Sequence, residues 1–183
     1  MFKSFARYII AWCLASAIFT AGNVARADDS KEYLVKAAFI YNFVKFVEWP
    51  DGRAISKENS IDICIIGDSE LSQTSSVFKA ASTSKLSLSL VEEKNPHNAA
   101  SHCHIAFIGG SEESRLGEIL SVLKSQPLLT VSDIDGFAEH GGMIGFTTED
   151  NKVKLVINPK AASATGIRID AQLLEIAAKV IDK

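Results

Sequence analysis

The segment "IDICIIG", residues 61–67, is a short isoleucine-rich run that ends at a glycine. Isoleucine is β-branched and favours extended backbone, so the pattern predicts a strand that stops at Gly67. The residues that follow, 68–81, are predicted to form a helix with Asp68 or Ser69 as its N-cap. A strand followed directly by a helix is the building unit of α/β domains.

Three more strands are predicted farther along the chain. The segment "LSLSLVE" (86–92) alternates apolar and polar residues, "HIAFIGG" (104–110) is apolar and precedes a helical pattern, and "LLTVSD" (128–133) is another apolar run. This order of strands and helices favours parallel pairing, with helices on both faces of the sheet.

The C-terminal part has a different pattern. Two strands, 143–148 and 152–158, are joined by a polar turn and are predicted to form a hairpin, and a final helix is predicted over 170–181. We therefore predict a single α/β domain. Its sheet is mixed and mostly parallel, with helices on both faces and a C-terminal hairpin.

Helical spacing is clearest between Leu34 and Val47, where apolar residues recur at three- and four-residue steps. We expect this helix to begin after Ser30 as N-cap and to end near Trp49, before Pro50. Additional aromatic residues widen its apolar surface: Phe39, Phe43, Phe46 and Trp49. Core packing is the expected use of this surface, and contact with a partner is the alternative.

The first 27 residues have the pattern of a secretory signal peptide. Lys3 and Arg7 precede an apolar stretch, and Ala25-Arg26-Ala27 is an A-x-A cleavage motif. The apolar stretch is well short of the roughly 20 residues that span a bilayer. We therefore expect cleavage after Ala27 and a mature exported domain of residues 28–183.

Charge argues against one class of partner. The whole chain has a formal net charge of −3, and loss of Lys3, Arg7 and Arg26 with the signal peptide lowers it by three to −6. Nucleic-acid binding depends largely on Lys and Arg side chains that contact phosphates. We therefore expect no nucleic acid among the partners.

Two cysteines remain in the mature chain, Cys64 and Cys103. Disulfides persist in exported proteins, and the first and third strands of a doubly wound sheet are often neighbours, which favours pairing. An intermolecular bridge or two free thiols would give the same cysteine count.

The segment "SHCHIAF" (101–107) also raises the question of a metal site. If this segment is extended, His102 and His104 point to one side and Cys103 to the other, so one metal ion cannot easily take all three. The remaining histidines, His97 in the predicted polar turn "KNPHNAA" (94–100) and His140, do not complete a ligand set. We expect no metal and no cofactor here, and solvated histidines that flank a disulfide.

Catalytic patterns are weak throughout the chain. No serine stands in a G-x-S-x-G elbow, the serine of "GDSE" (67–70) is expected to cap a helix, and the glycines of "IGGSEES" (108–114) are expected to form a tight turn. We therefore predict no catalytic residues. This is the pattern of a binding protein rather than of an enzyme.

The segment 131–144, "VSDIDGFAEHGGMI", follows a strand at the edge where α/β folds place ligands. Its candidate ligand-binding residues are Asp133, Asp135, Phe137 and His140. A purely structural loop is the alternative, and its acidic spacing does not match a calcium-binding EF-hand.

Five blocks follow one another behind the signal peptide: "VKAAFIYNFVKFVEWP", "CIIGDSE", "CHIAFIG", "LLTVSDIDGFAEHGGMIGF" and "VKLVINPKAASATGIRIDAQLLEIAAKVI". Together they resemble the YfiR-like periplasmic proteins over nearly the whole mature chain. The most specific blocks are N-F-V-K-F-V-E-W-P and L-T-V-S-D…G-G-M-I.

The resemblance implies a non-catalytic periplasmic repressor. Its partner would be the periplasmic part of an inner-membrane diguanylate cyclase, and repression would lower cyclic di-GMP and biofilm formation. A homodimer and an outer-membrane lipoprotein that sequesters the repressor are further partners of this kind. The family's disulfide carries over to Cys64 and Cys103. Some relatives have a second cysteine pair in the C-terminal half, and this chain has no cysteine after Cys103.

Two surfaces are candidates for partner contact. One is the segment "TGIRID", in which Ile167 and Ile169 alternate with Arg168, and the other is Arg53 in the turn after the first helix. The alternative function is a periplasmic small-molecule sensor with its ligand near residues 133–140.

Overall fold

The computed structural model describes residues 23–50, 60–83 and 86–181, with side chains from Lys31 onward. The chain divides into two compact units, Met1–Glu32 and Tyr33–Lys183. Only a few helical residues of the first unit are described. Among the described residues, none of the helices is both long enough and apolar enough to cross a membrane.

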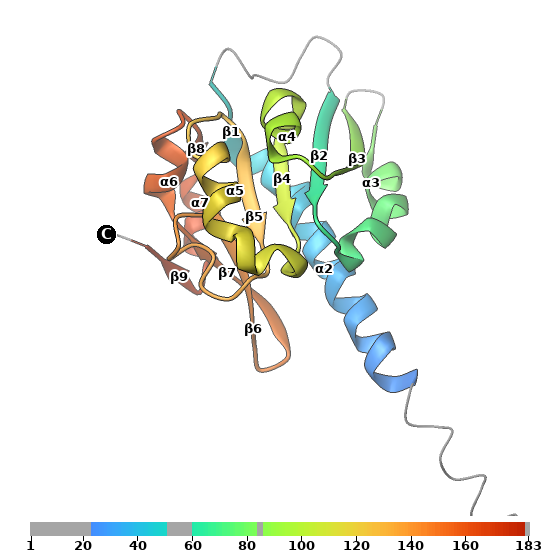
Figure 1. The fold of residues 1–183 in the computed structure, drawn as a ribbon. Coiled ribbons are helices and arrows are strands. Elements are labelled where there is room, and N and C mark those ends of the chain that lie inside the picture. Colours follow the sequence, from blue (N-terminus) through green and yellow to red (C-terminus); the bar gives the residue numbers. More distant parts are fainter. Residues whose placement is uncertain (1–22, 51–59, 84–85, 182–183) are drawn as a thin grey trace, which may run out of the picture. The chain divides into compact units, whose positions relative to one another are not determined.

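The second unit is built on a seven-stranded sheet of order β3-β2-β4-β5-β6-β7-β9 (Figure 1). The strands from β3 to β6 are mutually parallel, β7 is antiparallel to β6, and β9 is parallel to β7. The bounds of the strands are β2 Ser60–Ile66, β3 Ser87–Glu93, β4 Ile105–Ile108, β5 Leu129–Ser132, β6 Ile144–Glu149, β7 Lys152–Ile157 and β9 Lys179–Val180. The sheet is therefore mixed and mostly parallel, as the sequence predicts.

The helices and a small second sheet complete the domain. Helix α2 leads into strand β1, which pairs antiparallel with β8 near the C-terminus of the chain. The bounds are α2 Asn23–Phe46, β1 Val47–Glu48, η2 Glu70–Thr74, α3 Ser75–Ala81, α4 Pro96–His102, η3 Gly110–Arg115, α5 Leu116–Leu123, α6 Pro159–Ser163, β8 Arg168–Ile169 and α7 Ala171–Glu175. Elements η2 and η3 are 3-10 helices.

Strand β2 is buried on both faces, which explains why its sequence is almost continuously apolar. Ile63 and Ile65 belong to one core, beneath α2 and α3, whereas Cys64 and Ile66 belong to the other, beneath α4 and α5. Figure 1 shows α4 and α5 in front of the sheet. Alternation along one strand thus divides its side chains between two cores.

Helix α2 differs from its predicted start and end. It passes through Ser30, which therefore is not its N-cap, and it ends at Phe46, so that the chain is already extended at Val47. The indole of Trp49 is buried, and its Nε1 donates to the carbonyl oxygen of His104 at 3.1 Å. The buried residues of α2 include Ala37, Ile40, Phe43 and Val44, whereas Leu34 is 46% exposed.

Two other elements differ from the prediction. The segment around His97, predicted to be a polar turn, is helix α4, with Asn95 as N-cap and Pro96 in its first turn. The predicted final helix over 170–181 ends at Glu175, and the chain then adds strand β9 to the sheet. Strand pairing of Lys179–Val180 with β7 outweighs the helical spacing of this segment.

Candidate functional site

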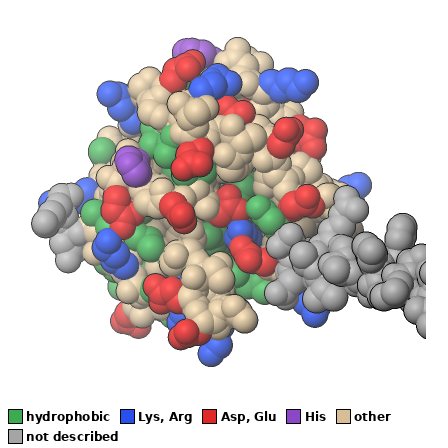
Figure 2. Space-filling model, turned by 60° about the horizontal axis from the view of Figure 1, so that its bottom comes forward, with side chains coloured by type: hydrophobic (Ala, Val, Ile, Leu, Met, Phe, Trp, Pro, Cys, Tyr) green, Lys and Arg blue, Asp and Glu red, His purple; other side chains and the backbone are tan. Residues whose placement is uncertain are grey.

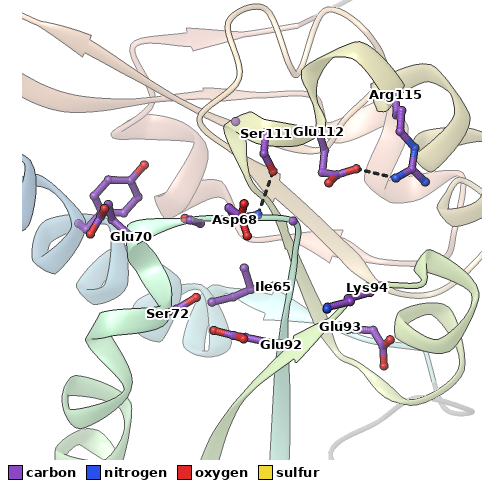
Figure 3. Close-up of a pocket in the computed structure, with 14 residues that line it drawn as sticks. Ile65, Asp68, Glu70, Ser72, Glu92, Glu93, Lys94, Ser111, Glu112 and Arg115 are labelled. Carbon is purple, nitrogen blue, oxygen red and sulfur yellow. Dashed lines mark hydrogen bonds and ion pairs between the residues drawn. The ribbon is translucent and has the colours of Figure 1, made fainter.

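A cleft of about 720 Å³ lies at the carboxyl ends of the first parallel strands (Figure 3). Strands β3 and β4 flank β2 on opposite sides, and the helices that follow β2 and β4 pack on opposite faces of the sheet. This arrangement makes the ends of β2 and β4 a topological switch point, the usual ligand position in open α/β sheets. Residues from 67–72, 92–94 and 110–115 line it, with Tyr33 and Ile65.

Close contact between two loops fixes one wall of this cleft. Gly67 has a φ of +83°, which favours glycine, and a side chain at Gly109 would collide with the backbone carbonyl of Asp68. The hydroxyl of Ser111 accepts a hydrogen bond from the Asp68 backbone N–H at 2.8 Å. Glycines at the ends of adjacent strands therefore let the β2 and β4 loops pack against each other.

The lining of the cleft is mostly acidic. The charged residues of the lining are five acids and two bases: Asp68, Glu70, Glu92, Glu93 and Glu112, with Lys94 and Arg115. One ion pair, between Arg115 Nη1 and Glu112 Oε2 at 3.1 Å, neutralises part of this charge. Figure 2 brings this end of the molecule forward and shows acidic side chains scattered across it. The excess of negative charge in the lining favours a ligand with a cationic group.

Local hydrogen bonds keep one of these acids ionised. A backbone hydrogen bond from Asn95 to the Glu93 carboxylate, at 3.1 Å, is the main reason that the pKa of Glu93 is lowered. The side chain of Asn98 also donates to Glu93, at 3.3 Å. The negative charge at the end of β3 is thus present across the neutral pH range.

The predicted ligand loop does not assemble a ligand site from its four candidate residues. Asp133 is bound by Lys36 at 2.6 Å and by the Tyr33 hydroxyl at 2.8 Å. Phe137 is 1% exposed and packs in the core beneath α5, so its ring is not available to a ligand. Asp135 and His140 are exposed, and His140 contacts the carbonyl oxygen of Gly136 at 2.7 Å.

The predicted partner segment is only partly available. Ile167 is fully buried in the core, which corrects its assignment to a surface. Arg168 is exposed in β8, and its Nε donates to Glu48 at 3.0 Å. A hollow of about 250 Å³ adjoins Arg168 and the half-buried Ile169. Arg53, the second candidate, lies outside the described residues.

Cys64 and Cys103 form a disulfide, with their Cα atoms 6.0 Å apart. The histidines beside it differ from the prediction, because the chain is not extended at His102, which is the last residue of α4. The exposed His102 ring turns back so that Nε2 lies 3.6 Å from Cys64 Sγ. His104 is buried rather than solvated, and its Nδ1 accepts from the Asp62 backbone N–H at 3.2 Å.

The cleft is the feature that sequence reasoning missed. Its main segments, "GDSE" and "IGGSEES", have the sequence signals of a helix cap and a tight turn. Each does supply local structure, since Ser69 caps η2 through Leu71 N. The signal that identifies the cleft is the pair of glycines, Gly67 and Gly109, at the ends of strands that the topology makes neighbours.

Comparisons with solved structures agree on the fold. One similar structure is a conserved domain protein from Vibrio cholerae O1 biovar eltor, with a TM-score of 0.56 and 11% sequence identity. The match covers 81% of this chain and 60% of that protein's chain. Another is an ABC domain in complex with L-Trp from Streptococcus pneumoniae, with a TM-score of 0.51 and 17% sequence identity. This match covers 67% of this chain and 55% of that protein's chain. The chain thus spans less than two thirds of either structure.

No curated protein matches the sequence. A family model described as YfiR/HmsC-like matches residues 33–178, which is almost the whole second unit. Members of this family are regulators that act in the periplasm. Because the match covers most of the sequence, the chain belongs to the YfiR/HmsC-like family.

Proposed function

We propose that this chain is a non-catalytic periplasmic regulator that binds the periplasmic part of an inner-membrane diguanylate cyclase and represses it. Repression lowers cyclic di-GMP and restrains biofilm formation. The observation that carries the proposal is the family match over residues 33–178. A sequestering lipoprotein and a homodimer stay predictions of the resemblance.

Export is part of this proposal. The signal-peptide pattern of residues 1–27 precedes the family match, so cleavage after Ala27 would leave the matched region whole. The signal peptide itself lies almost entirely outside the described residues. The regulator would then meet only the periplasmic part of its partner.

The paired strands β1 and β8 are the favoured contact surface. Arg168 and Glu48 have side chains that are 79% and 67% exposed, and they form an ion pair at the rim of the 250 Å³ hollow. Phe46 and Ile169 supply half-buried apolar surface to the same hollow. Arginine and aromatic side chains around a recess are typical anchors of protein interfaces.

A cellular assay tests the regulatory function. Deletion of the gene should raise cyclic di-GMP, and expression of the wild-type chain with its signal peptide should restore the low level. Expression without residues 1–27 should fail to restore it, because the chain would then stay on the wrong side of the membrane. An unchanged cyclic di-GMP level in the deletion strain would contradict the proposal.

The cleft supports a second candidate function, a small-molecule sensor. Its volume of about 720 Å³ is within the usual size of ligand pockets, and its acidic lining selects for a cationic or amine-bearing molecule. A ligand that prefers one state of the repressor would shift the population of that state. Thermal unfolding with a panel of small amines and matched carboxylic acids tests this function, since only a bound compound raises the melting temperature.

A further inference from the structure

Three potential metal ligands meet on the face of the sheet that α4 covers. The Sγ atoms of Cys64 and Cys103 and a ring nitrogen of His102 all lie within 4.8 Å of one another. None of its members lines the 250 Å³ hollow beside β1 and β8 or the 720 Å³ cleft. It therefore calls for a separate explanation.

Helix α4 is the element that assembles the cluster. It ends at His102, and Cys103 follows directly as its C-cap residue, so the two side chains leave the backbone at a bend rather than alternating along a strand. Cys64 reaches them from the middle of the neighbouring strand β2. The bend lets an imidazole and a thiol from adjacent positions approach the same point.

The spacing fits tetrahedral zinc. Zn–S and Zn–N bonds of about 2.3 and 2.05 Å place a sulfur and a nitrogen about 3.6 Å apart in a tetrahedral site. The observed distance from Cys64 Sγ to His102 Nε2 is 3.6 Å. Two zinc-bound sulfurs lie about 3.8 Å apart, so the cysteine sulfurs must separate once their bond is broken.

We propose that the reduced form of this protein binds a thiophilic d10 cation such as Zn²⁺ through Cys64, His102 and Cys103. A dithiol reductant first transfers two electrons to the disulfide, which yields two cysteine thiols and oxidises the reductant to its own disulfide. The metal ion then binds both thiolates and the neutral imidazole, and two protons pass to solvent. The fourth position is open to water, because His102 is exposed.

This site makes metal binding and disulfide formation alternatives. Both use the same two sulfurs, so a bound metal ion protects the thiols from oxidation, and the disulfide excludes the metal ion. Either link joins the end of α4 to β2. The Cα atoms of Cys64 and Cys103 are 6.0 Å apart. His104 does not belong to the cluster, and its Nδ1 accepts a hydrogen bond from the Asp62 backbone N–H.

The test uses the purified mature chain, reduced under anaerobic conditions and freed of reductant, with Co²⁺ as a spectroscopic probe. We expect one Co²⁺ per reduced chain, with thiolate-to-cobalt charge-transfer absorption that Zn²⁺ abolishes. The oxidised chain should show no such absorption. His102→Ala should weaken binding at least about tenfold, a loss typical even of groups outside the first coordination shell.

A matched control is available on the same helix. His97 is also exposed on α4 but does not belong to the cluster, so His97→Ala should bind Co²⁺ as tightly as the wild type. Circular dichroism checks that the reduced chain is folded. Absence of Co²⁺ binding, equal binding by His102→Ala, or a reduced chain that stays unfolded when Zn²⁺ is added would overturn the proposal.

Discussion

Lys36 Nζ lies 2.6 Å from Asp133 Oδ2, and this contact joins helix α2 to the residue that follows strand β5. Both side chains are largely buried, with 4% and 13% exposure. Loss of either member of such a largely buried charge pair is costly, because the remaining charge keeps less compensation for its lost hydration. The loop after β5 is therefore fixed to α2 by a charge pair.

Removal of one member of this pair should be costly. Asp133→Ala removes the carboxylate that lies beside the largely buried Lys36 ammonium, and the free energy of unfolding should fall by about 3 kcal/mol. Urea unfolding followed by circular dichroism measures the change. The double variant Lys36→Met/Asp133→Leu should recover much of the loss, and a double variant as unstable as Asp133→Ala would contradict this account.

The disulfide should be a main support of the fold. It closes a loop with a sequence separation of 39 residues, which corresponds to about 4 kcal/mol in the chain-entropy model. Cys64→Ser and Cys103→Ser should lose equal stability, and the double variant should lose little more, because either change removes the whole cross-link. His102→Ala should be nearly silent in the oxidised protein. Non-reducing peptide mapping provides the direct check, since two alkylatable thiols in freshly isolated protein would refute the bridge.

The pH dependence of one exposed contact can also be predicted. Lys179 Nζ donates to Glu139 Oε1 at 2.6 Å, and this bond is the main reason that the pKa of Glu139 is lowered. A lowered folded-state pKa means that the contact stabilises the fold above the ordinary pKa of glutamate, about 4.3, and that this contribution is lost as the pH falls through the folded value.

The effect on stability should be small, because the Lys179 and Glu139 side chains are 58% and 39% exposed. The pKa itself is the better observable. Lys179→Ala should raise the pKa of Glu139 towards its ordinary value in an NMR titration of the carboxyl carbon. A titration curve that Lys179→Ala leaves unmoved would show that the contact is not formed in solution.

Charge reversal on the β1 and β8 strands tests the proposed partner surface. Arg168→Glu places a second carboxylate beside that of Glu48, and it should raise cyclic di-GMP while the melting temperature stays close to that of the wild type. Arg53→Glu should act in the same direction. Lys124→Glu is the matched control, because it makes the same change of charge at an exposed position after α5. Full repression by both arginine variants would remove these residues from the surface.

Local patterns predicted the central part of the fold well. The isoleucines of β2 and the apolar run of β4 specify strands that must be buried, and a doubly wound sheet makes these first and third strands neighbours. Helix α5 follows from the same logic, since Leu116, Ile119 and Leu123 are buried on one face. In these elements the apolar period, the length and the turn residues all favour the same structure.

The parts that were missed depend on long-range pairing or on weak local signals. Strand β1 pairs with β8 over only two residues each, Val47 with Ile169 and Glu48 with Arg168, which leaves almost no periodic signal in the sequence. Helix α4 has a recognisable start, Asn95 followed by Pro96, but it is only seven residues long and has little apolar period. Because α4 extends to His102, this histidine lies at the end of a helix and not on a strand as predicted.

The proposed regulation depends on direct binding of this chain to a membrane diguanylate cyclase from the periplasmic side. The most direct measurement is in-cell cross-linking of the mature chain, carrying a photoreactive residue in place of Lys45 at the rim of the β1 and β8 hollow. Mass spectrometry should then find a covalent product with the periplasmic part of such a cyclase, and the product should diminish when Arg168→Glu is introduced. The contradicting result is the absence of any diguanylate cyclase among the cross-linked products, obtained in cells where deletion of the gene does alter cyclic di-GMP. That result would argue against direct binding at this surface.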